Sequence, residues 1–532
     1  MGFYNRAMTS AKEHSWDTRP ASKRTPDLFA AFMGGLVSLA LELAAARLLA
    51  PAFGTTEVVW TAIIGLILLY LSAGYVIGGR WADRSPHAAT LYTIITAAGL
   101  TIAVIPLLAR PILRVAVRGM LAWNIGLIAG PFIFVLILFV VPVTLLACIS
   151  PFVIRLSMRD VAASGATAGR IYAVSTLGSF IGTFLPNMVL IPTLGTRRTF
   201  LTLALVTLLM GLWGLWRAHR RRFWALAWTV LIVAALFALQ PGAIKPVAGL
   251  VEERESAYNF IQVVDRENGE RHLLLNEGQG IHSVVMPEGY LLTGGPWDYY
   301  LIAPYFNAAP HPPEAARSLL VIGLAAGTTP AQYTEIYGPI PIDGVEIDPE
   351  IVAVGREYFG MTYPNLTAHV TDGRAFLHQR AARYDVVAVD AYRLPYIPWH
   401  LTTVEFFQEV RAHLTEKGVV AINVGHTEDD WRLVEALVAT MGQVYPSIHV
   451  IDVPVSFNAI VVATVQPTSP DNLVENLPLL DDPRLRQVAR QAIAYRVTPR
   501  PGGRIFTDDH APLEHITHDL ALRHILGVGR EP

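Results

Sequence analysis

Residues 319–346 read LLVIGLAAGTTPAQYTEIYGPIPIDGVE. The stretch contains an apolar run, a turn of small residues, a helix-forming segment and a second apolar run that ends in an acid. A strand, a crossover helix and a parallel strand have this order in a doubly wound α/β sheet. The alternation continues and predicts strands at 319–322, 342–346, 366–370, 384–390 and 419–424, with helices near 329–337, 349–358, 373–380, 402–414 and 428–442.

A turn of small residues, from Gly323 to Thr328, follows the first of these strands. Ligands of doubly wound sheets bind beyond the carboxyl ends of the strands. Small residues there let the backbone approach a ligand closely, and the first amides of the next helix point toward it. We therefore expect Gly323 and Gly327 to contact a cofactor. The turn lacks the third glycine of the G-x-G-x-x-G pattern, which disfavours a dinucleotide.

Acidic residues follow the next three strands at the same edge of the predicted sheet. Glu346 ends the second strand, Asp372 and Gly373 follow the third, and Asp390 ends the fourth. A carboxylate at the position of Glu346 can accept hydrogen bonds from both ribose hydroxyls, and Asp372 can meet an adenine amino group. This row of acids favours a sulfonium nucleoside over a pyrophosphate. Taken singly, Asp372 could instead be a helix N-cap, Glu346 a surface charge and the glycines plain turns.

The N-terminal half of the chain has the composition of a membrane domain. Charged residues make up 16% of the 532 residues, whereas soluble domains carry about 25%, and the deficit lies in residues 28–240. A membrane-spanning helix needs about 20 mostly apolar residues. Seven segments meet this length, and the first should be retained rather than cleaved as a signal peptide. They are 28–50, 58–79, 89–109, 125–148, 170–192, 197–216 and 223–240.

The loops between these segments predict an orientation in the cell membrane. Lys and Arg are concentrated in the loops that share a side with the N-terminus, which indicates a cytoplasmic N-terminus. Seven crossings would then place the C-terminal domain outside the cell, where adenosyl cofactors are not normally supplied. The side of the membrane that the C-terminal domain faces therefore stays open.

The sequence divides into four parts: a cytoplasmic tail (1–27), a transmembrane domain of about seven helices (28–240), a small β-rich subdomain (250–315) and a larger α/β domain (316–532). Asn268-Gly269 predicts a hairpin in the small subdomain. The net charge of −2 excludes nucleic acid as an expected partner, and no cluster of ligand types predicts a metal site. The lipid bilayer is an expected partner, and a homodimer is left open.

Several motifs resemble those of the spermidine synthase-like (polyamine aminopropyltransferase) family, and in particular its membrane-fused members. The similarity runs from about Glu255 to Glu514. It implies a methyltransferase-like, Rossmann-like fold that binds decarboxylated S-adenosylmethionine or S-adenosylmethionine as co-substrate, with Gly323, Gly327, Glu346, Asp372 and Gly373 as its contacts and Asp390 as the group that deprotonates an amine acceptor. The motifs are Val321–Gly327, Gly344–Asp348, Thr371–Phe376, Val389–Tyr392, Tyr396–Phe406 and Thr507–Glu514.

The acceptor half of the site departs from the family. Ala326 and Arg393 stand where the family carries aspartates, so we expect poor activity with a polyamine, which needs carboxylates along its channel. Candidate substrate-binding residues are Gln279, Asp298, Tyr392 and His400.

The leading hypothesis is a membrane-anchored transferase, nominally of an aminopropyl group to an amine. The alternatives are an S-adenosylmethionine-dependent methyltransferase, and a transporter or sensor whose soluble domain binds a nucleoside or polyamine without turnover. Asp508, Asp509 and Glu514 belong either to the site or to a cluster that orders a loop.

Overall fold

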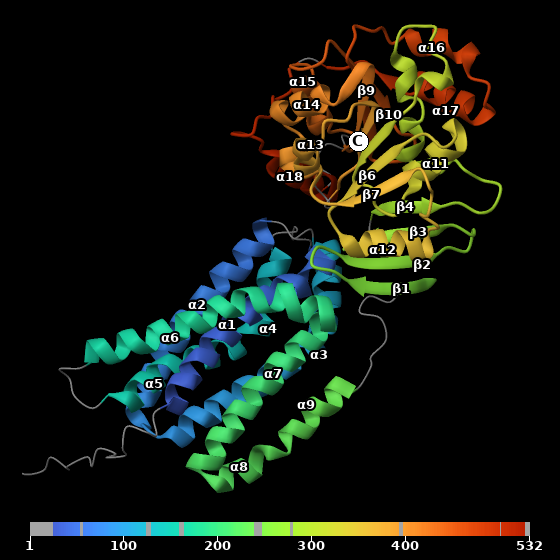
Figure 1. The fold of residues 1–532 in the computed structure, drawn as a ribbon. Helices are drawn as coiled ribbons and strands as arrows, with labels where there is room; N and C mark the ends of the chain where they lie inside the picture. The colour runs from blue at the N-terminus through green and yellow to red at the C-terminus, as the bar shows by residue number, and fades with distance from the viewer. Residues whose placement is uncertain are drawn as a thin grey trace, which may run out of the picture. The chain divides into compact units, whose positions relative to one another are not determined.

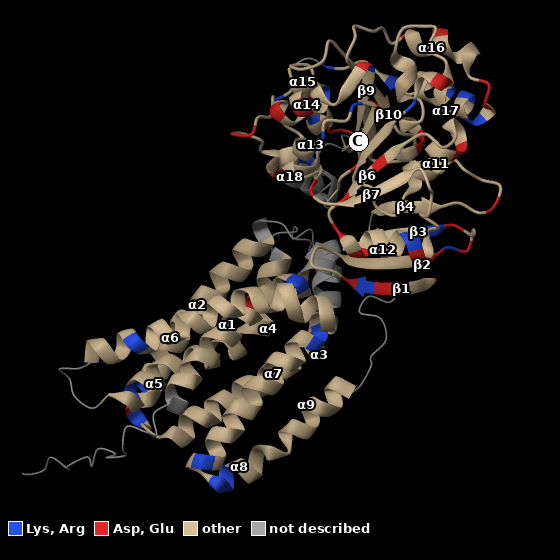
Figure 2. Cartoon of the chain, in the orientation of Figure 1, with Lys and Arg blue, Asp and Glu red and all other residues tan. Residues whose placement is uncertain are grey.

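The computed structural model describes residues 25–53, 57–123, 129–158, 164–238, 247–276, 280–392, 397–500 and 502–526. The chain divides into two compact units. The first is formed by most of the apolar half, and the second contains all residues from Pro241 onward (Figure 1). Charged residues are sparse along the helices of the first unit and dense in the second (Figure 2).

All regular secondary structure in the described residues of the first unit is helical. It contains six apolar helical stretches long enough to cross a membrane. One of them, Ser164–Ala218, has 55 residues and would be about 80 Å long as a single helix. Gly195, with φ of 78°, breaks it, so it covers two of the predicted spans, and seven crossings stay a prediction. The helices are α1 (Thr25–Phe53), α2 (Glu57–Arg84), α3 (Ala88–Trp123), α4 (Ala129–Ala147), α5 (Ile149–Ser157), α6 (Ser164–Leu185), the π-helical η3 (Pro186–Leu190), α7 (Ile191–Ala218), α8 (Arg220–Ala227) and α9 (Thr229–Ala238).

Glycines let the helices of this unit approach one another closely. Between α1 and α6, a Cβ added to any of three glycines would overlap a backbone carbonyl oxygen of the facing helix. Small residues at such contacts are typical of packed membrane helices. The pairs are Gly35 with Ser175, Gly178 with Phe32, and Gly182 with Leu36.

The second unit begins with a small antiparallel sheet in the order β1-β2-β3-β4. The hairpin predicted at Asn268-Gly269 is confirmed, because it joins β2 to β3 and Gly269 has φ of 86°. The strands are β1 (Leu250–Glu255), β2 (Phe260–Asp265), β3 (Arg271–Leu275) and β4 (Ile281–Val285).

The larger sheet has eight strands in the order β12-β10-β11-β9-β8-β5-β6-β7. Strands β5 to β9 pair in parallel, whereas β11 is antiparallel to both of its neighbours. The chain order reverses between β5 and β8, and this switch point is where such sheets bind ligands. The strands are β5 (Leu319–Ile322), β6 (Ile342–Glu346), β7 (Leu366–Val370), β8 (Tyr384–Val389), β9 (Leu414–Gly425), β10 (Ser447–Asp452), β11 (Asn458–Thr464) and β12 (Arg496–Val497).

Helices cover both faces of this sheet (Figure 1), so its central strands are buried on both sides, as parallel strands usually are. Residues 386–389 of β8 and 419–422 of β9 are fully buried. The doubly wound α/β fold is therefore confirmed. The helices are α10 (Pro296–Tyr300), η4 (Ala303–Phe306), η5 (Pro313–Ala315), α11 (Thr328–Tyr337), α12 (Pro349–Tyr358), α13 (Gly373–Gln379), η6 (Trp399–Leu401), α14 (Val404–Ala412), α15 (Arg432–Met441), α16 (Asn472–Asn476), η7 (Leu477–Leu479), α17 (Pro483–Ala494) and α18 (Leu513–Leu526).

Candidate functional site

The glycine turn after β5 lies against the turn after β8. Gly323 has φ of 92°, and a Cβ there would lie 2.5 Å from the carbonyl carbon of Asp390. Gly327 has φ of 91° and directly precedes α11, where a Cβ would lie 2.7 Å from the Met361 side chain. Both positions therefore require glycine, for conformation and for space.

Glu346 lies at the carboxyl end of β6 with only 8% of its surface exposed, so the interpretation as a surface charge is wrong. Its Oε2 accepts a hydrogen bond from the amide of Ala325 at 3.0 Å, and its Oε1 accepts one from the amide of Asp348 at 3.1 Å. Burial raises the pKa of Glu346 to about 7, although these backbone hydrogen bonds lower it. Each carboxylate oxygen has a second lone pair, which leaves acceptor capacity for a ribose hydroxyl.

Asp372 caps α13 and pairs with His400. Its Oδ1 accepts hydrogen bonds from the amides of Arg374 and Ala375, both at 3.0 Å, which confirms the N-cap interpretation. Its Oδ2 lies 2.9 Å from Nε2 of His400. This bond to His400 is the main reason that the pKa of Asp372 is lowered to about 2. Asp372 is therefore an ionised carboxylate with a fixed orientation at the end of β7.

Gly373 closes the same turn. A Cβ at this position would overlap the side chain of Ile322 on β5. The third strand end is thus held tightly against the first.

Asp390 follows β8 in surroundings of neutral hydrogen-bond donors. Its Oδ1 accepts a hydrogen bond from Nδ2 of Asn423 at 2.9 Å. Burial raises the pKa of Asp390 to about 7, although the hydrogen bond from Asn423 lowers it. A carboxylate with this pKa suits a general base near neutral pH. The nearby hydroxyl of Tyr300 donates instead to the backbone oxygen of Val389 at 3.1 Å.

Sequence reasoning missed Asn423, although it is a polar residue near the carboxyl end of an otherwise apolar run. Its Oδ1 is buried and has no hydrogen-bond partner within the described residues. Its backbone oxygen accepts a hydrogen bond from the hydroxyl of Tyr392 at 3.2 Å. Asn423 therefore joins Asp390 and Tyr392, and it leaves one amide oxygen available beside the acid.

Asp298 is buried in α10, and its carboxylate accepts hydrogen bonds from the residues around it. It accepts hydrogen bonds from the amides of Thr293 and Gly294 at 2.9 and 2.8 Å, from the Thr293 hydroxyl at 2.9 Å, and from Gln332 at 2.6 Å. These four donors give Asp298 a structural role, and its predicted contact with substrate stays a prediction.

Gln279 and Arg393 lie outside the described residues, whereas Ala326 lies within them. The amide of Ala326 donates to the hydroxyl of Ser283 at 2.9 Å, which fastens the glycine turn to β4. Among the residues that the structure describes, no group of His, Cys, Asp and Glu could hold a metal ion.

Part of the chain is similar in sequence to known proteins. Residues 313–475 match the family model described as spermine/spermidine synthase domain. The probable polyamine aminopropyl transferase of Bifidobacterium longum is 33% identical over 223 residues, which are 40% of this chain and 48% of that protein. The eEF1A lysine and N-terminal methyltransferase of Homo sapiens is 28% identical over 167 residues, 29% of this chain and 24% of that protein.

This chain therefore spans about half the length, or less, of these curated relatives. A solved structure of a probable spermidine synthase from Corynebacterium glutamicum aligns with a TM-score of 0.38 at 19% identity, over 49% of this chain and 98% of that one. The matched region holds the glycine turn and all three acidic strand ends. Within the C-terminal half of this chain, residues 313–475 are therefore similar to a spermine/spermidine synthase domain.

Proposed function

We propose that this chain is a membrane-embedded transferase that moves a group from decarboxylated S-adenosylmethionine or S-adenosylmethionine, nominally an aminopropyl group, to an amine. The observation that carries the proposal is the row of acids Glu346, Asp372 and Asp390 at the ends of β6, β7 and β8, beside the glycine turn after β5. The matched synthase domain contains all of these residues and supports the same conclusion.

The first two acids would hold the nucleoside. Glu346 accepts from the ribose hydroxyls, and Asp372 accepts from the adenine amino group. Gly323, Gly327 and Gly373 remove the side chains that would keep the backbone away from the ligand. A sulfonium carries a positive charge, which acidic strand ends attract.

Asp390 would act on the acceptor. An amine is inert as a nucleophile while it is protonated, so a base must take its proton. The nitrogen lone pair then attacks the carbon next to the sulfonium, the carbon–sulfur bond breaks, and its electron pair stays on sulfur to give a neutral thioether. Tyr392, which is joined to Asp390 through Asn423, would line this side of the site.

A methyltransferase is the second candidate, because Ala326 stands where the synthase family carries an aspartate. Such an aspartate would repel the carboxylate of intact S-adenosylmethionine, and alanine does not. The similarity to a human methyltransferase points in the same direction.

The two reactions release different thioethers, so product analysis separates them. The full chain is incubated with each donor and a panel of monoamines and polyamines, and the nucleoside products are quantified by mass spectrometry. Aminopropyl transfer releases methylthioadenosine, and methyl transfer releases S-adenosylhomocysteine. We expect one of these products, with putrescine as a poor acceptor. Binding of a donor without any product would instead favour the sensor or transporter hypothesis.

We also propose that the apolar helices of the first unit cross the lipid bilayer with the N-terminus in the cytoplasm. The apolar length of six stretches supports the crossing, and the distribution of Lys and Arg between the loops supports the orientation. Tags on the two termini, tested for protease access in sealed vesicles, would check this. Equal protection of both tags would mean an even number of crossings.

A further inference from the structure

The guanidinium of Arg374 is held between two carboxylates from distant parts of the chain. Its Nε and Nη2 donate to Glu409 on α14 at 2.7 to 3.0 Å. Its Nη1 and Nη2 donate to the two oxygens of Asp508, both at 2.7 Å. The Arg374 side chain is only 15% exposed. Paired donation of this kind to a carboxylate fixes geometry as well as energy.

Asp508 lies beyond the matched synthase domain, in the segment 503–513. Its Oδ1 also accepts from the Thr403 hydroxyl at 2.7 Å, and its amide donates to Glu405 at 3.0 Å. The amide of Val404 donates to the carbonyl of Phe506 at 2.9 Å. The segment is thus fastened to the start of α14, immediately after η6.

Arg374 reaches η6 as well. Its Nη1 donates to the backbone oxygen of His400 at 3.3 Å, and the ring of His400 contacts Oδ2 of Asp372. Arg374 follows Asp372 by two positions, at the N-terminus of α13. One side chain therefore joins the strand end that carries Asp372, the turn that carries His400, and the segment that carries Asp508.

We infer that Arg374 and Asp508 are positioning residues that hold the His400 turn against Asp372, so that a segment outside the matched domain determines how the site recognises adenine. The inference rests on the proposed function, because it assigns Asp372 to the adenine amino group. A carboxylate in a fixed orientation accepts from an amino group and repels a carbonyl oxygen at the same place. Loosening the His400 turn would therefore first weaken the discrimination between an amino group and a carbonyl oxygen.

The test uses the full chain in detergent and two probes, S-adenosylhomocysteine and its 6-oxo counterpart S-inosylhomocysteine. Dissociation constants for both are measured for the unmodified chain and for Asp508→Asn. We expect Asp508→Asn to weaken the adenosyl probe by about tenfold, the scale of one charged hydrogen bond, and to leave the inosyl probe nearly unchanged. A general loss of structure would weaken both probes alike.

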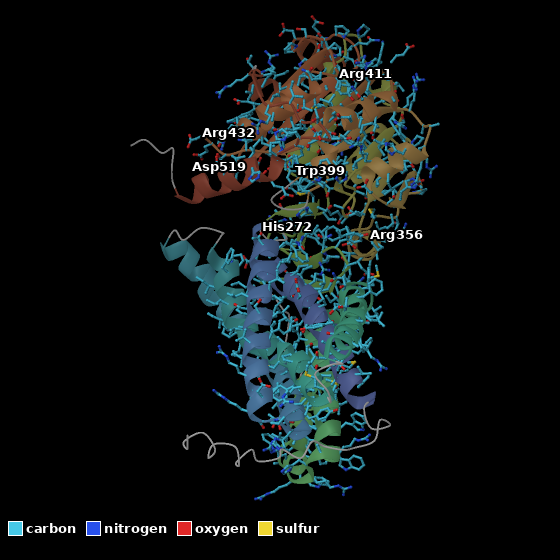
Figure 3. All side chains as sticks on the ribbon, turned by 90° about the vertical axis from the view of Figure 1, so that its left-hand side faces the viewer. His272, Arg356, Trp399, Arg411, Arg432 and Asp519 are labelled. Atoms are coloured by element: carbon cyan, nitrogen blue, oxygen red, sulfur yellow. The ribbon has the colours of Figure 1, made fainter. Side chains whose placement is uncertain are left out.

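Asp519→Asn is the matched control. Asp519 on α18 accepts from Arg432 at 2.7 Å and is 41% exposed, compared with 39% for Asp508. Arg432 and Asp519 are labelled side by side in Figure 3. This control should change neither dissociation constant. Asp508→Glu keeps a carboxylate and should therefore retain part of the adenosyl preference that Asp508→Asn loses.

The outcomes separate the inference from the function on which it rests. An unchanged ratio of the two dissociation constants in Asp508→Asn, with the adenosyl probe still bound by the unmodified chain, overturns the inference alone. An unmodified chain that binds neither probe excludes intact S-adenosylmethionine as the donor and overturns the inference, whereas use of the decarboxylated donor is judged separately by the release of methylthioadenosine.

Discussion

The two units use glycine for different purposes. In the first, Gly178 and Gly182 lie inside α6 with ordinary helical backbone, and they bring it against the carbonyl oxygens of α1. In the second, Gly323 and Gly327 lie at turns with φ near 90°, and they bring a backbone turn to the edge at which doubly wound sheets bind ligands.

The residue type alone therefore does not indicate function. A glycine inside a packed helix is required because the facing helix leaves no room for a side chain. A turn glycine is required by its own backbone conformation as well. The first kind should affect the stability of the helical unit. The second should affect ligand binding.

The largest effect is expected from Gly178→Leu. The new side chain would overlap the carbonyl oxygen of Phe32, and overpacking of this kind costs about 3 kcal/mol or more. Gly169→Leu on the same helix is the control, because a Cβ at Gly169 has no atom within 4 Å. Thermal unfolding in detergent should show a large loss for Gly178→Leu alone. Equal stability of the two variants would contradict close packing of α1 and α6.

Gly323→Ala should mainly impair ligand binding. The substitution adds backbone strain at φ of 92° and a contact with the backbone of Asp390, which together cost about 2 to 3 kcal/mol. Gly338→Ala isolates the strain, because Gly338 has φ of 77° and open space around its Cβ position. Calorimetric titration with an adenosyl ligand should show weaker binding only for Gly323→Ala. Similar losses in both variants would mean that strain alone is responsible.

Glu346→Gln should weaken adenosyl binding by about 1 to 3 kcal/mol, the scale for a lost charged hydrogen-bond partner. The fold should survive, because an amide oxygen can still accept one of the two backbone hydrogen bonds that Glu346 receives. The measurement is the dissociation constant of the same ligand. An unchanged constant would remove Glu346 from the site.

The pH dependence of stability tests the two buried acids directly. The pKa values of Glu346 and Asp390 are both raised to about 7 by burial, whereas unfolded carboxyls titrate near pH 4. The folded chain therefore binds more protons between these values, and its free energy of unfolding falls as pH rises from about 4 to about 7. Asp390→Asn should flatten this slope when melting temperatures are compared across the interval. An equally steep slope in Asp390→Asn would mean that the Asp390 carboxyl does not bind a proton in this interval in the folded chain.

Much of the second unit could be predicted from local pattern. Four of the five parallel strands match the predicted ranges to within one residue, and the helices overlap theirs, because buried strands that alternate with amphipathic helices leave a clear periodicity. Strand β9 begins at Leu414, five residues before its predicted start. Strands β10 to β12 were not predicted. They form the antiparallel edge of the sheet, and their positions depend on pairing with distant segments rather than on local sequence.

The candidate site, like the fold, could be predicted only where local pattern determines it. Strand ends identified Glu346, Asp372 and Asp390, since topology brings those positions to one edge. Contacts between residues far apart in sequence could not be predicted. The pairing of His400 with Asp372, and of Asp508 with Arg374, depends on how η6 and the segment after β12 fold back onto α13.

The central claim is that the acidic strand ends hold an adenosyl sulfonium. Calorimetric titration of the full chain in detergent with S-adenosylmethionine and with its decarboxylated form tests it most directly. We predict saturable binding of at least one of the two compounds at one site per chain. The absence of saturable binding for both would contradict the account.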